Sequence, residues 1–206
     1  GQGPKQGYES RMARLYHVAF ATSRGRCQGA AMRKFIVNIA DLDFQPSGHG
    51  AERPGAGHAR DIYQARIGQV GMAIGAQKLG YNVTCLPPGK RAFPLHSHTV
   101  NEEMFFILEG SGELRVGKES FPVRQGDFIA CPPGGPATAH QLVNTSKTAQ
   151  MRFLAVSTMM RPEIAEYPES GKFGVYGELA PDASGKPRII RHIARPSDGR
   201  EYWEGE

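Results

Sequence analysis

From residue 81 onward, the chain consists of short runs with the composition of β-strands, each bounded by a turn that contains glycine or proline. The candidate strands are residues 81–86, 104–108, 112–116, 119–123, 128–131, 140–144 and 151–157. Turn residues separate these runs, and no helical period interrupts the series. Many short strands joined by tight turns are typical of an antiparallel sandwich or barrel, so we expect an all-β fold.

The two ends of the chain are expected to differ from this central region. Residues 35–43 form a plausible first strand, whereas the chain after Thr158 is rich in proline, glycine and charge and is expected to be irregular and laid over the barrel surface. Residues 1–31 show no period, which predicts an extension: a tag remnant, an over-long gene start or an arm that packs on something. We therefore expect one domain over residues 32–206, with a motif core at about residues 70–160.

The charge and the cysteines narrow the possible partners and the compartment. Residues 1–31 hold five basic residues against one acidic residue, a net charge of +4 out of a total of +5, so residues 32–206 carry only +1. A nearly neutral body argues against nucleic-acid binding, and the longest apolar run is far too short to span a membrane. Cys27, Cys85 and Cys131 are widely spaced and contain no CxxC pair, which favours a reducing cytoplasm over a disulfide framework.

Two histidines separated by one residue, His96 and His98, point to the same face of a strand and can share one ion, because side chains on a strand alternate faces. Glu103 has the wrong parity to join them on an unbroken strand. The polar residues 99–101 are therefore expected to turn the chain and return Glu103 toward the histidines on the neighbouring strand. With His140, from a second turn-rich stretch, these residues form a ligand set that suits Fe, Mn, Ni, Cu or Zn.

The spacing of these residues resembles the first sequence motif of the cupin superfamily. Gly89 is followed by the pair His96 and His98, then after four residues by Glu103, and after six more residues by Gly110. The sequence departs from the family pattern by one extra residue before the first histidine. The six-residue gap before Gly110 favours Glu103 over its neighbour Glu102 as the carboxylate ligand.

The second cupin motif is also present. Gly126 precedes Pro132 and Gly134 at the family spacing, and His140 is followed by Asn144 at the family spacing, but five residues instead of two separate Gly134 from His140. Both departures lie in turns, where insertions cost little, so they affect the lip of the pocket more than the ligands. The stretches LPPGKRAFPLHSH, EEMFFILEG, AEYPESGK and EYWEGE extend the resemblance to a group of uncharacterised bacterial single-domain cupins of the cupin 2 conserved-barrel type.

The resemblance implies a double-stranded β-helix, or jelly-roll barrel, with irregular N- and C-terminal extensions. It implies one divalent transition metal (Zn, Fe, Mn or Ni) held by His96, His98, Glu103 and His140. We expect a metal-dependent enzyme acting on a small anionic or oxygen-rich metabolite, with isomerase, lyase or dioxygenase chemistry. The alternative is a metal-dependent module that binds or senses a small ligand without turnover.

Several residues are candidates for the pocket around the metal. Phe105 and Ile107 share the parity of Glu103 and are expected to line the barrel. Arg91, Arg115 and Arg124 are candidates to hold an anionic substrate, although each also fits a surface position.

Other side chains are expected to have structural roles. Cys131 is expected to be a small buried thiol and Asp127 to fix the turn after Gly126 through its side chain. His49 and His58 lack a close partner spacing and are expected to be solvated. The second apolar face of residues 104–108 must be covered by another sheet, an N-terminal arm or another subunit, from which we expect a homodimer.

Overall fold

The computed structural model of the protein describes residues 35–47 and 59–206. The expected extension at residues 1–31, together with Cys27, His49 and His58, lies outside the described residues. The strands are β1 (Phe44–Pro46), β2 (Arg66–Gly68), β3 (Leu79–Leu86), β4 (Ser97–His98), β5 (Glu103–Glu109), β6 (Ser111–Val116), β7 (Glu119–Arg124), β8 (Phe128–Cys131), β9 (His140–Val143), β10 (Met151–Thr158), β11 (Glu163–Tyr167), β12 (Lys172–Leu179) and β13 (Arg188–Ala194). The short helices are η1 (Ile39–Asp41), α2 (Ala59–Ile62), α3 (Val70–Ile74), η2 (Pro136–Thr138) and η3 (Pro196–Asp198). Across these two ranges, no helix has the length and apolar character that a membrane crossing requires.

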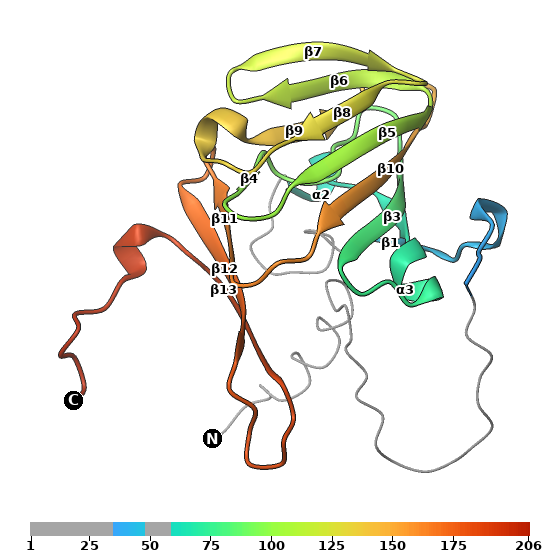
Figure 1. The fold of residues 1–206 in the computed structure, drawn as a ribbon. Helices are drawn as coiled ribbons and strands as arrows, with labels where there is room; N and C mark the ends of the chain where they lie inside the picture. Colours follow the sequence, from blue (N-terminus) through green and yellow to red (C-terminus); the bar gives the residue numbers. More distant parts are fainter. Residues whose placement is uncertain (1–34, 48–58) are drawn as a thin grey trace, which may run out of the picture.

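The strands form three antiparallel sheets, and together these make the all-β jelly-roll barrel that the sequence predicts (Figure 1). The largest sheet has six strands in the order β1-β2-β3-β10-β5-β8. A three-stranded sheet, β7-β6-β9, and a four-stranded sheet, β13-β12-β11-β4, complete the fold. The seven strands predicted from residue 81 to residue 157 are all present, with ends that differ by at most two residues.

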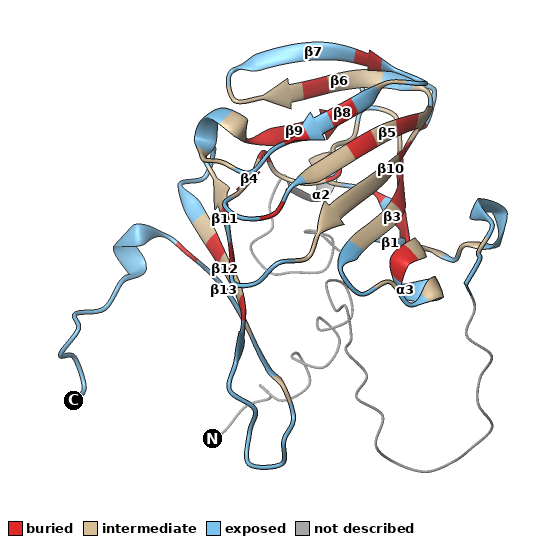
Figure 2. Ribbon diagram, in the orientation of Figure 1, coloured by how far each residue is buried: buried red, intermediate tan, exposed pale blue. Residues whose placement is uncertain are grey.

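The hydrophobic core lies between the six-stranded and the three-stranded sheets. Its largest buried side chains are Leu86, Phe105, Ile107, Leu114, Val123, Ile129, Leu142, Met151 and Phe153. Figure 2 shows buried positions along β5, β8, β9 and β10, whereas most of β7 and of the ribbon formed by β12 and β13 is exposed. On β5, the buried residues are Phe105 and Ile107, which confirms the parity expected for the inner face of this strand.

The chain passes from the six-stranded sheet to the three-stranded sheet at Gly110, between β5 and β6. Gly110 has a φ of 81°, and a Cβ atom at this position would lie 2.5 Å from the carbonyl oxygen of Gln150. Only glycine combines this backbone conformation with the missing side chain that the close approach requires. The motif glycine therefore makes a corner of the barrel.

The prediction of a first strand at residues 35–43 is wrong. η1 occupies Ile39–Asp41, and the first strand is β1, which begins at Phe44 and pairs with β2. The side-chain oxygen of Asn38 accepts a hydrogen bond from the backbone N–H of Ala40 (2.9 Å) and caps η1. Such local side-chain bonds compete with strand pairing, which explains the helical turn.

The prediction of an irregular C-terminal tail is also wrong, because β11, β12 and β13 form an antiparallel ribbon that joins the barrel through pairing of β11 with β4. Figure 1 shows β12 and β13 extending away from the barrel. A Cβ atom at Gly174 would lie 3.0 Å from the ring and hydroxyl of Tyr176, so this glycine leaves room for the tyrosine side chain. Glycines that suggested irregular structure thus allow close packing within a sheet.

The outer apolar face of β5 faces the segment that precedes β1 across a cavity. Leu108 lies in a cavity that Ile39 and Leu42 also line. Further along the face, the ring of Phe106 packs against Phe128 with centroids 4.4 Å apart, and Phe128 remains 74% exposed. The expected homodimer stays a prediction.

Candidate metal centre

The four side chains that the sequence predicts as metal ligands come together in one cluster. His96 precedes β4, His98 ends β4, Glu103 begins β5 and His140 begins β9. Two backbone hydrogen bonds join His96 and His140, from His140 N to His96 O (2.8 Å) and from His96 N to His140 O (3.3 Å). Each of the four residues offers one possible ligand atom, and these atoms lie within 4.8 Å of one another.

Glu103 reaches the cluster after a turn, as expected, but not on a strand that neighbours β4. β4 pairs with β11 in the four-stranded sheet, whereas β5 pairs with β8 and β10 in the six-stranded sheet. The prediction that Glu103 returns on the neighbouring strand is therefore wrong. Because His140 lies on the three-stranded sheet, the cluster draws His98, Glu103 and His140 from three different sheets.

Backbone carbonyl groups hold two of the three imidazole rings. Nδ1 of His96 lies 2.9 Å from the carbonyl oxygen of Pro94, and Nδ1 of His140 lies 3.2 Å from the carbonyl oxygen of Thr138. A carbonyl oxygen only accepts, so each Nδ1 carries the proton and donates it. Nε2 of each ring is then the nitrogen that faces the cluster, and it can bind a metal ion when it carries no proton.

The third ring, that of His98, supplies the test of whether these residues fit a metal ion. Both of its ring nitrogens are buried and lack a hydrogen-bond partner among the described residues. Nε2 of His98 lies 3.7 Å from Oε2 of Glu103, which in turn lies 3.1 Å from Nε2 of His140. Two opposite ligands of an ion with bonds of about 2.1 Å are about 4.2 Å apart. The ligand atoms of the cluster lie within 4.8 Å of one another, so only its widest separations must contract slightly for an ion to bind. The residues fit a metal ion, and the buried, unpartnered imidazole is costly without one.

The protonation states of the cluster follow from burial and from mutual contacts. Burial, the largest influence, lowers the pKa of His96 to about 4, and the nearby Glu103 carboxylate offsets this only in part. Burial opposes ionisation of Glu103, yet the hydrogen bond with His140 and the surrounding imidazoles together lower the pKa of Glu103 to about 2. Burial also opposes a charged His140, but contacts with Cys131 and Glu103 raise the pKa of His140 above its ordinary value. A metal ion that binds here must therefore displace a proton from His140.

The low pKa of His96 predicts that the metal-free protein loses stability as the pH falls. Between pH 6.5 and about 4, the folded protein binds fewer protons at His96 than the unfolded chain does, so the free energy of unfolding decreases as the pH is lowered through this range. We expect a loss of about 2 kcal/mol, allowing for partial solvation of a half-buried ring. Near pH 6.5 the raised pKa of His140 opposes this change, because the unfolded chain is only about half protonated at this residue. Below about pH 5.5 His140 is largely protonated in both states, and Glu103 adds a slope only below its ordinary pKa of 4.5.

Urea unfolding in EDTA at a series of pH values measures this effect. His96→Gln should flatten the dependence between pH 6.5 and 5, because glutamine does not titrate. His192→Gln, which changes an exposed histidine on β13, is the matched control and should retain it. An unchanged pH dependence in His96→Gln would contradict the assignment.

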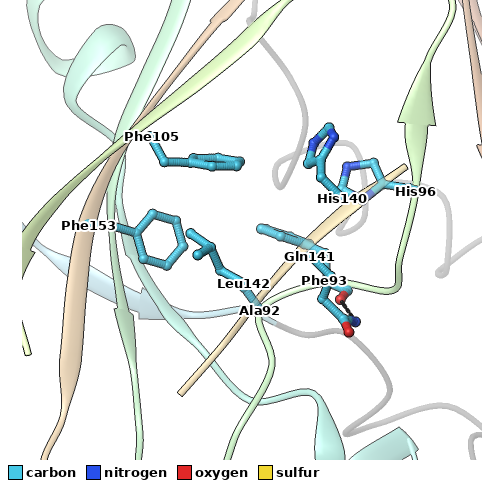
Figure 3. Close-up of a pocket in the computed structure, with 8 residues that line it drawn as sticks. All are labelled: Ala92, Phe93, His96, Phe105, His140, Gln141, Leu142 and Phe153. Atoms are coloured by element: carbon cyan, nitrogen blue, oxygen red, sulfur yellow. Dashed lines mark hydrogen bonds between the residues drawn. The ribbon is translucent and has the colours of Figure 1, made fainter. Parts of the chain in front are cut away.

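A small apolar cavity lies inside the barrel beside His96 and His140 (Figure 3). Phe105 lines it, as expected, with its ring 5.8 Å from that of His140, whereas Ile107 is fully buried in the core and does not line it. The cavity has a volume of about 20 Å³, which is room for about one water molecule. The barrel interior is therefore filled by side chains, and a metabolite has no space on this side of the cluster.

The three arginine candidates have different positions. Arg115 is near the site: it donates to the side chain of Gln141, which lines the cavity, and its Nη2 lies 2.6 Å from Oε1 of Glu169. Arg91 is partly buried and pairs through its backbone with Val143. Neither Arg91 nor Arg115 lines the cavity.

Arg124 is not brought to the site. It is exposed at the end of β7 and pairs with Ser111 at the start of β6, whereas His140 pairs with Val116 at the other end of β6. Five residues of strand separate these positions, about 17 Å. Its backbone N–H donates to the Asp127 side chain (2.7 Å), which confirms the expected role of that aspartate in the turn.

The structure brings two further residues of the C-terminal ribbon to the cluster and a third into contact with one of them, and the sequence predicts none of the three. Glu163 of β11 is buried, and its Oε2 lies 3.7 Å from Nδ1 of His98. The ring of Tyr167 lies nearly parallel to that of His96, with centroids 6.2 Å apart and an interplanar angle of 21°. The Tyr167 hydroxyl lies 2.9 Å from that of Tyr176. The alternation in EIAEY, followed by the turn PESG, was the available signal for a strand here.

Two neighbours of the candidate ligands have the positions that the sequence predicts. Glu102 is exposed, so the carboxylate of the cluster belongs to Glu103. Cys131 is a free, buried thiol of the core.

Comparison with known proteins identifies the central part of the chain. The profile of the family described as Cupin domain matches residues 82–157. Cupincin of Oryza sativa subsp. indica is 36% identical over 97 residues, which make up 45% of this chain and 18% of Cupincin. An uncharacterized protein of Methanocaldococcus jannaschii is 39% identical over 59 residues, 29% of this chain and 44% of that protein. The matched residues thus span less than half of the length of each of these relatives.

Solved structures resemble more of the chain than the sequence profile does. A sugar phosphate isomerase from a cupin superfamily of Silicibacter pomeroyi has a TM-score of 0.63 and 25% identity, covering 82% of this chain and 98% of that one. A putative sugar phosphate isomerase of Acidithiobacillus ferrooxidans has a TM-score of 0.62 and 22% identity, covering 84% and 99%. The likeness therefore extends beyond residues 82–157.

Proposed function

The chain belongs to the cupin superfamily through its domain at residues 82–157, and we propose that this domain binds one divalent transition metal. The ligands are His96, His98, Glu103 and His140. The observation that carries the proposal is the convergence of these side chains around a buried His98 whose ring nitrogens have no partner among the described residues. Zinc, iron, manganese and nickel all accept three imidazoles and one carboxylate.

The bound ion would supply Lewis-acid polarisation of a substrate oxygen, because four protein ligands leave a position open on a five- or six-coordinate ion. The chain's own residues prepare this chemistry. The carbonyl groups of Pro94 and Thr138 orient His96 and His140. Phe105 and Phe153 exclude bulk water from the inner side of the cluster.

We infer that the protein is an enzyme for a small, anionic or oxygen-rich metabolite, with chemistry of the isomerase, lyase or dioxygenase type. The similar Silicibacter pomeroyi protein is described as a sugar phosphate isomerase, which supports sugar phosphates as the first substrate class to test. A sugar phosphate also has the vicinal oxygens that a divalent ion chelates. The inner cavity has no room for such a molecule, so it must approach the cluster from outside the barrel core.

The test is turnover by metal-loaded protein. Protein loaded separately with Zn²⁺, Mn²⁺, Fe²⁺ or Ni²⁺ is incubated with aldose and ketose phosphates, and their interconversion is followed by NMR. We expect turnover with at least one metal, reduced about 100-fold or more in His98→Ala and within about twofold of wild type in His192→Ala. Calorimetry on the same samples detects binding without chemistry. Binding without conversion would instead establish a binding or sensing module. The absence of both binding and conversion would refute this substrate class.

A further inference from the structure

We propose that Glu163 of β11 positions His98 for metal binding, so that the C-terminal ribbon outside the matched domain completes the metal centre. This inference rests on the proposed function, because it concerns a residue that acts on one ligand of the proposed metal.

Glu163 is a buried carboxylate with only 5% of its surface exposed. Its Oε1 accepts hydrogen bonds from the backbone N–H groups of Thr99 (2.9 Å) and Val100 (3.2 Å). Its Oε2 accepts from the backbone N–H of Asn101 (2.8 Å) and from the Asn101 side-chain amide. Every one of these partners is a donor, so the group is present as the carboxylate, which only accepts.

These bonds fix the turn between two of the proposed ligands. Thr99, Val100 and Asn101 are three consecutive residues that lead from His98 to Glu103, and all three N–H groups point to one carboxylate. Backbone N–H groups gathered in this way form a strong anion site. The position of Glu103 relative to His98 therefore depends on Glu163.

The same carboxylate faces the one imidazole that no carbonyl group holds. Nδ1 of His96 and Nδ1 of His140 each contact a backbone carbonyl oxygen, whereas Nδ1 of His98 is buried without a hydrogen bond in the described structure. Oε2 of Glu163 lies 3.7 Å from it. A shift of about 0.7 Å would bring the pair to hydrogen-bond distance. A carboxylate that accepts from the far nitrogen of a ligating histidine sets the ring orientation and raises its basicity.

The charges of the site agree with this role. With neutral imidazoles, the carboxylates of Glu103 and Glu163 balance the two positive charges of a divalent ion. A buried site with no net charge avoids the large cost of an uncompensated charge. The pairing of β11 with β4, in which Ala165 lies opposite His98, holds Glu163 in place.

The experiment compares zinc affinities by competition with a chelating dye. We expect Glu163→Gln to bind zinc about 10- to 100-fold more weakly than wild type. Glu166→Gln makes the same change on the same strand at a position of opposite parity and should stay within about threefold of wild type. Asn101→Ala removes the amide partner of Glu163 but keeps the carboxylate beside His98, and should also stay within about threefold.

A second readout separates orientation of His98 from general support of the turn. In the zinc-loaded wild type, nitrogen-15 NMR should show a protonated Nδ1 on His98 with a hydrogen-bonded proton resonance, and Glu163→Gln should shift that resonance. If Glu163→Gln does not fold, Glu163→Asp, which keeps the charge and withdraws the carboxylate by one methylene, is measured in its place with the same expectation.

Zinc affinity within about threefold of wild type in the folded Glu163 variant, or an equal loss in Asn101→Ala, would overturn the inference. If the wild type still binds zinc in that case, the proposed metal site stands and only the role of Glu163 is refuted. A wild-type protein that binds no zinc, iron, manganese or nickel would instead refute the proposed function.

Discussion

His98→Ala is expected to abolish most of the metal-dependent stability of the protein while leaving the metal-free protein nearly as stable as the wild type. The metal-free protein loses packing at residue 98 but also loses a buried ring with two unpartnered nitrogens, and these effects oppose each other. The metal-loaded protein loses one of four ligands. If about 10–16 kcal/mol of binding free energy is shared by four ligands, one of them accounts for about 3–4 kcal/mol, a factor of about 100 to 1,000 in affinity.

Urea unfolding with EDTA and with excess Zn²⁺ or Mn²⁺ measures both quantities. A metal at about 1,000 times its Kd should stabilise the wild type by about 4 kcal/mol, because it binds only the folded state. Bound metal should stabilise the whole barrel, because three of the proposed ligands come from three different sheets. His192→Ala should keep the full metal-dependent gain. If His98→Ala kept it too, His98 would not be a ligand.

Gly110→Ala is expected to destabilise the protein by about 3–5 kcal/mol. The new Cβ would lie 2.5 Å from the carbonyl oxygen of Gln150, on a residue with a φ of 81°. Both the backbone conformation and the contact with backbone atoms oppose the substitution. The corner between two sheets has no flexible side chain that could move aside.

Gly126→Ala separates these two causes. Gly126 also has a positive φ, of 94°, but a Cβ atom there would meet nothing within 4 Å. It should therefore lose only the conformational cost of about 1 kcal/mol. Chemical denaturation of both variants gives the comparison. Equal losses at the two glycines would show that the close approach at Gly110 does not limit stability.

The residues of the proposed metal centre could be grouped from the sequence because the patterns that mark them are local. His96 and His98 share a strand face through a spacing of two, and the distance from Glu103 to Gly110 matches a known motif. Turn residues likewise marked the seven central strands. These features depend on near neighbours in the chain, which sequence patterns report directly.

The remaining features depend on contacts between distant segments. The chain crosses from one sheet to another between His98 and Glu103, and no residue type within that turn indicates the change of sheet. Glu163 lies 65 residues from His98 and reaches it only through the pairing of β11 with β4. Arg124 has the right charge for an anionic substrate but sits at the wrong end of its strand, which only the register of β6 and β7 reveals.

The metal content of protein purified without added metal and without a nickel column tests the central claim most directly. Elemental analysis should find about one equivalent of zinc, iron, manganese or nickel in the wild type and in His192→Ala, and far less in His98→Ala, since a single site with four protein ligands retains its ion during purification. A wild-type protein that contains no metal and takes up none of the four on titration would contradict the account.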